Sequence, residues 1–218
     1  MRRSIVVSCA GAIGVLGILS AQDFARGSLM WYINRAKANH QTVVHLPIPK
    51  ELYAEVGDLS SAAGRASVVL VNFVDEVTTY DTYEIHTWTK FRIRERLGRY
   101  QRIREDDLSS DVPERLLPIL PNEFITVQPL GTVQLGGVTL IRMDSRLTPL
   151  PASEPRLMFV QFSAGGSMAG LTFGHEGVFS ITFDGYLRPR LDTSHNELKQ
   201  QIDSCCGGRL DKLRGLLR

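Results

Sequence analysis

The sequence contains only three cysteines, and this scarcity limits how the chain can be cross-linked. Cys9 lies near the start, whereas Cys205 and Cys206 are adjacent near the end. Adjacent cysteines close no long loop, and no second cysteine pair or neighbouring histidine completes a zinc site. We interpret the pair as two thiols. A strained bond between the neighbours, or a link to a second chain, is the alternative in an oxidising compartment.

An excess of one charge is also missing. The chain has 25 basic and 23 acidic residues, a formal net charge of +2. Arg2 and Arg3 account for this difference, so the remainder of the chain is balanced. A global positive field that gathers nucleic acid is therefore absent, and we expect no specific nucleic-acid partner.

Familiar catalytic and cofactor patterns are lacking as well. Ser167 follows two glycines without the spacing of a hydrolase nucleophile turn, and the later glycines open no helix of a dinucleotide site. His175 and Glu176 are interpreted as ordinary polar residues of a turn. The five histidines are scattered and predict no metal site: His40, His45, His86, His175 and His195. We therefore expect neither a cofactor nor an enzyme.

The clearest pattern that is present lies in residues 1–22. Arg2 and Arg3 precede an uncharged run over residues 4–21. This run is longer than the roughly 7 to 15 apolar residues of a secretory signal and slightly shorter than the about 20 of a spanning helix. Residues 1–22 are thus a signal peptide or an N-terminal membrane anchor. We expect the body of the protein to be periplasmic or extracellular, or tethered to the inner membrane by residues 4–21.

The remainder divides into three parts by its periodicity. Residues 23–48 predict a helix and a linker, and residues 49–189 predict a β domain with a leading helix that ends near Gly64. Residues 190–218 predict a helical tail interrupted by two glycines. Its end, residues 209–218, is basic and amphipathic; we favour packing on the barrel or on a second subunit over contact with a membrane surface.

Alternation by twos dominates residues 67–183. Runs rich in β-branched and aromatic residues are separated by glycine and proline turns, which is typical of antiparallel strands. The expected fold class is mainly β: a small antiparallel, OB-like β-barrel with flanking N- and C-terminal helices. The expected strands are 67–77, 83–93, 124–128, 138–142, 157–162, 168–173 and 178–183.

The order of these segments is similar to that of a known group. The run 67–77, the strand that begins Tyr83-Glu84-Ile85-His86-Thr87, the Gly136-Gly137 turn and the closing strands 170–183 resemble exported bacterial β-rich domains of unknown function. More distantly, they resemble the OB-like barrel of netrin-type modules. The resemblance implies a small barrel with flanking helices over roughly residues 50–186 and implies no activity. Netrin-type protease inhibitors use an N-terminal cysteine, which this chain lacks at a matching position.

One strand carries an unusual row of polar and basic side chains. Alternate positions of a single strand place these side chains on one side, where they form a candidate anionic-ligand face. Its possible partners are an anionic envelope polymer, a lipid head group or a protein. Strands also carry basic residues outward to prevent aggregation, and this is the interpretation that we favour. The row consists of His86, Trp88, Lys90, Arg92, Arg94 and Arg96.

The sequence thus predicts an exported, non-catalytic binding or interaction module of the cell envelope. The alternative hypothesis is a hydrolase of an unrecognised type. It requires His86 or His175 to meet a carboxylate and a nucleophile in a deep pocket.

Overall fold

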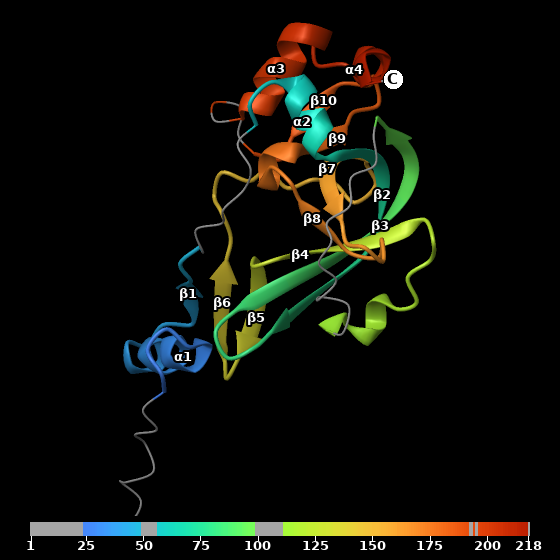
Figure 1. The fold of residues 1–218 in the computed structure, drawn as a ribbon. Coiled ribbons are helices and arrows are strands. Elements are labelled where there is room, and N and C mark those ends of the chain that lie inside the picture. The colour runs from blue at the N-terminus through green and yellow to red at the C-terminus, as the bar shows by residue number, and fades with distance from the viewer. Residues whose placement is uncertain (1–23, 49–55, 99–110, 192–193, 195, 218) are drawn as a thin grey trace, which may run out of the picture.

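The computed structural model describes residues 24–48, 56–98, 111–191, 194 and 196–217. Over these residues the protein is mainly β, with two sheets and with helices at both ends (Figure 1). The predicted fold class is thereby confirmed at this level. The proposed signal or anchor, residues 1–22, lies outside the described residues, as do residues 49–55 of the predicted leading helix. That helix begins later than predicted, at Leu59, because Asp58 caps its start and residues 56–58 are not helical.

The larger sheet is built on one long hairpin. Its strands β2 (Ser67–Tyr80) and β3 (Ile85–Leu97) pair antiparallel, as their alternation predicts. The sheet order is β10-β9-β7-β2-β3-β4, and β8 also pairs with β7. The other strands are β4 (Glu123–Gln128), β7 (Arg156–Phe162), β8 (Ala169–Leu171), β9 (Val178–Ile181) and β10 (Leu187–Pro189).

Closure of this sheet into a barrel is not found in the described part of the chain. β8 approaches β4 through a single parallel bridge between Ile125 and Met168, and the hydrogen-bonded path ends at β4 and β10. A hydrogen bond from Ile125 N to Ser167 O (2.9 Å) supports the bridge. The ladder is therefore continuous from β10 to β4 and is joined beyond β4 only at this point.

The smaller sheet has the order β1-β6-β5 and comprises β1 (Val43–His45), β5 (Gly131–Leu135) and β6 (Val138–Arg142). β1 pairs parallel with β6, whereas β5 and β6 form the hairpin around the two turn glycines. The helix α1 (Leu29–Ala38) packs on this sheet through a separate apolar cluster (Figure 1). The predicted linker before residue 48 thus supplies a strand.

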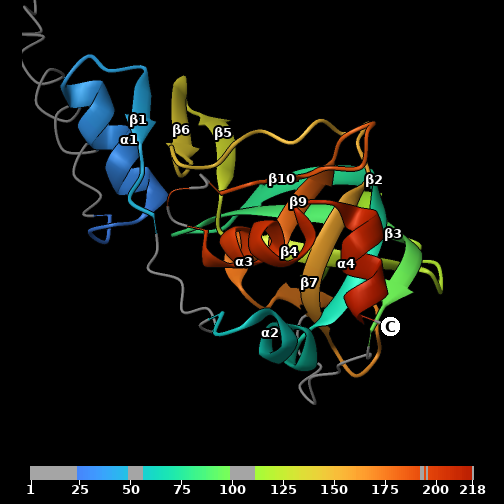
Figure 2. The ribbon, with the colours of Figure 1, turned by 90° about the horizontal axis from the view of Figure 1, so that it is seen from above.

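The large sheet is apolar on both faces. On the inner face, Phe91, Phe124 and Phe162 belong to one core cluster. On the opposite face, Leu157 and Phe159 lie beneath three helices, which Figure 2 shows over β7 and β9. These helices are α2 (Leu59–Arg65), α3 (Glu197–Cys206) and α4 (Leu210–Leu217).

The C-terminal tail packs on the domain, as favoured from the sequence. Leu210 and Leu213 of α4 are buried in the core beneath the helices. Gly207 has φ 60°, the left-handed conformation that ends α3 and that glycine adopts without strain. The predicted interruption by glycine therefore separates two helices.

Candidate functional site

In the middle of the predicted anionic-ligand face, two side chains are buried by the rest of the fold. Trp88 and Lys90 are only 6% and 8% exposed. Trp88 packs with Leu116, from the short 3-10 helix Glu114–Leu116, and Trp88 Nε1 donates a hydrogen bond to Thr79 Oγ1 (2.8 Å). Lys90 Nζ donates to the carbonyl oxygen of Pro118 (2.6 Å). The segment around residues 112–119 therefore covers the middle of the row.

A buried carboxylate pairs with two of the predicted cations. Glu123, 3% exposed, lies opposite Arg92 on β4. Its Oε2 is 3.0 Å from Lys90 Nζ, and its Oε1 is 2.7 Å from an Arg92 terminal nitrogen. Burial raises the pKa of Glu123, but the hydrogen bonds from Arg92 and Lys90 outweigh it and hold that pKa below its usual value. Glu123 therefore neutralises part of the positive charge of Lys90 and Arg92, two cations of the candidate anionic-ligand face.

A β-bulge divides the remainder of the row. Glu95 pairs with Leu70 and Ile93 pairs with Val71, so Arg94 is the extra residue on β3. Because directly paired residues point to the same face, Arg96 lies on the face opposite to Arg92. The structure thus brings together His86, Trp88, Lys90 and Arg92 on one face and separates Arg96 from them.

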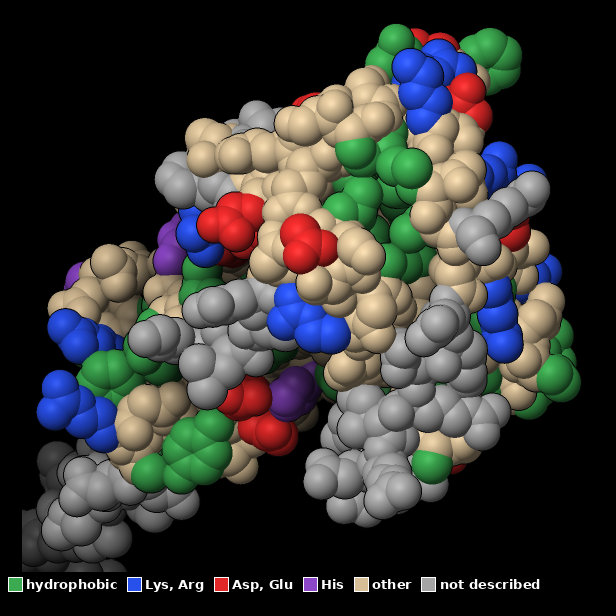
Figure 3. All heavy atoms as spheres, turned by 45° about the horizontal axis from the view of Figure 1, so that its top comes forward, with side chains coloured by type: hydrophobic (Ala, Val, Ile, Leu, Met, Phe, Trp, Pro, Cys, Tyr) green, Lys and Arg blue, Asp and Glu red, His purple; other side chains and the backbone are tan. Residues whose placement is uncertain are grey.

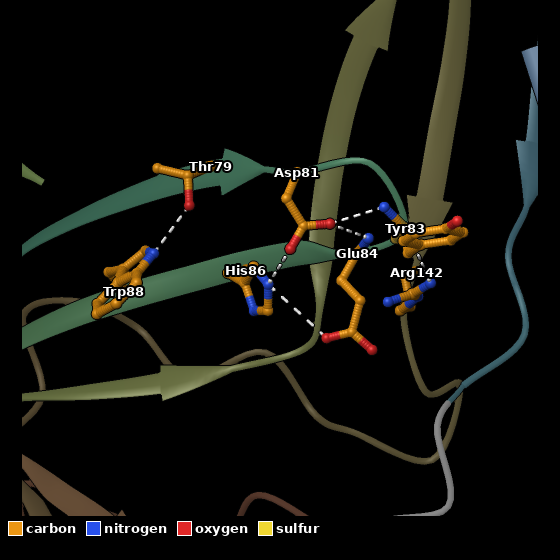
Figure 4. A network of polar contacts seen from close by, with 7 residues as sticks. All are labelled: Thr79, Asp81, Tyr83, Glu84, His86, Trp88 and Arg142. Atoms are coloured by element: carbon orange, nitrogen blue, oxygen red, sulfur yellow. Dashed lines mark hydrogen bonds and ion pairs between the residues drawn. The ribbon is translucent and has the colours of Figure 1, made fainter. Parts of the chain in front are cut away.

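His86 belongs to a polar network at the tip of the β2–β3 hairpin (Figure 4). Its Nε2 is 3.3 Å from Asp81 Oδ2 and 3.7 Å from Glu84 Oε2. Asp81 Oδ1 accepts hydrogen bonds from the backbone N–H groups of Tyr83 and Glu84, which keep the pKa of Asp81 low together with the bond to His86. An Arg142 terminal nitrogen donates to Tyr83 O (3.2 Å) and ties the tip to β6. These contacts fix the shape of the turn.

The network has no sign of a metal centre. No group of three or more His, Cys, Asp and Glu side chains within the described ranges is arranged to hold a metal ion. The two partners of His86 are carboxylates, which orient its imidazole.

A second polar group lies on the inner face of the large sheet, beyond the phenylalanine core. In the paired rows across β2, β3 and β4, Phe91 is followed by Thr89, whose Oγ1 donates to Glu76 Oε2 (3.0 Å). Gln128 follows on β4 and accepts from Arg190 (3.3 Å). We name this group the inner polar cluster; its members are Glu76, Thr89, Gln128, Arg156 and Arg190.

Arg156 is the most deeply placed cation of the inner polar cluster. It is 7% exposed, and its guanidinium carbon lies 5.4 Å from the ring centroid of Phe91 and 5.5 Å from that of Phe73. Burial, and then the positive charge of Arg190, lower the pKa of Arg156 to about 10. Arg156 still carries its charge at neutral pH.

His175 approaches the same charges from the short helix Gly174–Gly177. Burial lowers the pKa of His175 to about 3, and the positive charge of Arg190 adds to this effect while Asp144 opposes it. Asp144 is itself paired with Arg146 (2.6 Å). His175 is therefore neutral in the folded protein at physiological pH.

The adjacent cysteines are joined to each other. The structure pairs Cys205 with Cys206 in a disulfide at the end of α3. This is the alternative to the two thiols that we expected.

Three hollows on the described surface lie away from the histidines. A groove of about 900 Å³ between α2 and α4 is lined by Leu59, Ala63 and Leu216, on the face where Figure 3 shows hydrophobic side chains gathered among the helices. A second hollow lies between α2 and α3, and a third of about 310 Å³ lies between α1 and the β2–β3 hairpin. Neither His86 nor His175 lines any of the three.

No known family model, curated protein or solved structure matches this chain.

Sequence reasoning missed Glu123, Arg156 and Arg190. Arg156 begins the strand pattern that continues to Phe162, and it lies on the same face as Met158 and Val160. A charged residue at a position that alternation places in the core was therefore the signal that could have identified it. Glu123 precedes Phe124 in the same way. Their partners are remote in the sequence, so periodicity does not reveal the pairing.

Proposed function

We propose that the protein is an exported, non-catalytic binding or interaction module of the cell envelope, built on a partly open, OB-like barrel. Five strands support this geometry in the order β2-β3-β4-β8-β7, since β7 returns to β2 and β8 meets β4 at the Ile125–Met168 bridge. OB-like barrels are five-stranded, partly open and serve as binding folds.

The observation that carries the binding role is the inner polar cluster. Interiors of small barrels are usually filled by apolar side chains, and the cost of burying a charged group selects against it unless it has a purpose. Here Arg156 sits in line with the apolar core residues Met158 and Val160. A polar end on an otherwise apolar inner face is typical of a site that orients a ligand.

The hydrolase alternative has less support. His175 is neutral and half-buried, and His86 contacts two carboxylates at an exposed turn. Neither arrangement supplies a base with an activated nucleophile.

The proposed export depends on residues 1–22. No helix within the described ranges combines the length and hydropathy needed to cross a bilayer, and residues 4–21 lie outside those ranges. Phe24, the first described residue, lines the hollow between α1 and the β2–β3 hairpin. Met30 and Tyr80 line the same hollow, and their side chains are 42% and 54% exposed. Aromatic and apolar side chains beside the leader support a membrane-proximal position for this end.

Cell fractionation followed by N-terminal sequencing of the native protein tests the proposal. Recovery in the membrane fraction with Met1 retained indicates an anchor, and recovery outside the cytoplasm with Gln22 first indicates a cleaved signal. Recovery in the cytoplasm with an intact start contradicts export.

A separate experiment tests the candidate anionic-ligand face of β3. Arg94→Glu is the suitable change, since replacing Arg92 also breaks the pair with Glu123. If this face binds anionic polymers or lipids, the variant elutes at lower salt from anionic lipid, glycan and oligonucleotide matrices. Unchanged elution removes the face as a binding surface.

A further inference from the structure

Arg156 is held in a position where its own protein does not complete its hydrogen bonds. Within the described chain, its side chain makes one hydrogen bond, a long one from a terminal nitrogen to Leu150 O (3.4 Å), and its buried Nε has no partner. A guanidinium has five N–H donors, and leaving buried donors unpaired is costly. The side chain is therefore prepared for further acceptors.

The carboxylates whose charge reaches Arg156 are each engaged elsewhere. Glu76 accepts a hydrogen bond from Thr89, and Glu154 forms an ion pair with Arg188 (2.7 Å). No described carboxylate lies within ion-pair distance of Arg156. Its positive charge is thus compensated only at longer range.

A second cation lies nearby. Arg190 is close enough for its charge to act on Arg156, and Gln128 Oε1 accepts from one Arg190 nitrogen. Two like charges near each other on a largely apolar face repel, and an anion between them relieves that repulsion.

Two aromatic rings lie close to the guanidinium of Arg156. Phe73 and Phe91 lie 5.5 and 5.4 Å from the guanidinium carbon, within cation–π range. A guanidinium held in this way presents its N–H edge as a planar fork that matches two oxygens of a carboxylate or phosphate.

We infer that the inner polar cluster binds an oxyanion, the carboxylate or phosphate group of a small ligand, with Arg156 as the bidentate donor and Arg190 as the second positive charge. Gln128 positions Arg190, and Glu76 repels the incoming anion and so favours ligands of low charge. This inference rests on the binding role proposed above and does not depend on export.

The test is titration of the purified full chain, in detergent if the leader is retained, with inorganic phosphate and separately with acetate. Ionic strength is held constant with chloride, and binding is followed by calorimetry and by the thermal midpoint. We expect saturable binding that raises the midpoint. A response to phosphate alone indicates a phosphate-bearing ligand, and a response to acetate indicates a carboxylate ligand.

Variants locate the binding. Arg156→Met abolishes it, and Arg156→Lys, which keeps the charge but loses the fork, weakens it by about tenfold or more. Glu76→Gln removes a repulsive charge and tightens it several-fold. Arg115→Met is the matched control, because that exposed arginine pairs with Asp75 on the other side of β2, and it leaves the affinity unchanged.

Three results overturn the inference: no saturable effect of either anion, equal binding by Arg156→Met, or equal loss with Arg115→Met. If Arg156→Met does not fold, Arg156→Lys and Glu76→Gln still decide, because the inference requires opposite changes from them. A protein that binds the anions but fractionates with the cytoplasm keeps this inference and loses the proposal of export.

Discussion

Glu123 pairs with two cations of the candidate anionic-ligand face, Lys90 and Arg92. Glu123→Gln leaves Lys90, whose side chain is 10% exposed, without its ion pair. Removing one partner of a buried pair costs about 3 to 5 kcal/mol, and we expect a loss of that size in the free energy of unfolding. Urea denaturation measures it.

The matched control for Glu123 is Asp75. Asp75→Asn breaks a pair with Arg115 that is open to solvent, and we expect a much smaller loss because water replaces the contact. Equal losses in the two variants would mean that burial of Glu123 contributes nothing.

His175 predicts a pH dependence. The unfolded chain takes up a proton near pH 6.5, whereas the folded protein does so only near pH 3. Stability is therefore lost as the pH falls through this window, by at most about 1.4 kcal/mol per pH unit from this group. In His175→Gln, urea unfolding between pH 7 and 4 shows a flatter dependence. Parallel pH curves for variant and wild type contradict the prediction.

Single residues also show how far the sequence carries. Alternation placed His86, Trp88, Lys90 and Arg92 on one face, and the structure does the same. It did not reveal the bulge at Arg94, because a bulge depends on the register of a partner strand. Alternation also did not reveal that Lys90 is buried, since the segment that covers it, around residues 112–119, is remote in the sequence.

At the scale of an element, the start of β5 depends on Gly131. Its φ is +143°, and an added Cβ would lie 2.8 Å from Thr87 Oγ1 and 2.9 Å from Thr78 Cγ2. We expect Gly131→Ala to cost about 1 to 3 kcal/mol, because β5 must move away from the long hairpin. Gly170→Ala, in β8 with nothing within 4 Å, is the control and is nearly neutral. Thermal unfolding of both variants makes the comparison.

The long elements were readable from the sequence and the short ones were not. β2 and β3 alternate over many residues, so an exception at one position does not obscure the pattern. β1 and β10 have three residues each, too few to establish a period. β5 was missed because it lies against the turn glycines at 136 and 137, where the sequence indicates only a turn.

At the scale of the whole molecule, the C-terminal helices hold one face of the large sheet. Leu213 is fully buried there, whereas Leu216 on the same helix is 61% exposed. Leu213→Asp buries a carboxylate and costs about 3 kcal/mol or more, and Leu216→Asp is close to neutral. Urea denaturation separates the two variants. Similar stability would mean that α4 does not cover the core.

The arrangement of the sheets could not be predicted from the order of strands. Antiparallel pairing followed from the short turns, but β1 pairs parallel with β6, far along the chain, and this pairing removes β5 and β6 from the large sheet. We predicted one barrel from the sequence because an alternating pattern identifies a strand but does not say which other strand it pairs with. The inner polar cluster was hidden for the same reason, since Arg156 begins β7 and Arg190 follows β10, two elements that are not neighbours in the sequence.

The parallel pairing also sets an order of assembly. Val43 of β1 pairs with Thr139 of β6, so the ribosome must synthesise residue 139 before β1 can pair with its neighbouring strand. Until then α1 lacks the sheet on which it packs, so the beginning of the polypeptide acquires its native neighbours only after residue 139 has been made. That delay leaves a window in which a peptidase reaches the proposed cleavage point after Ala21 before α1 docks on the small sheet.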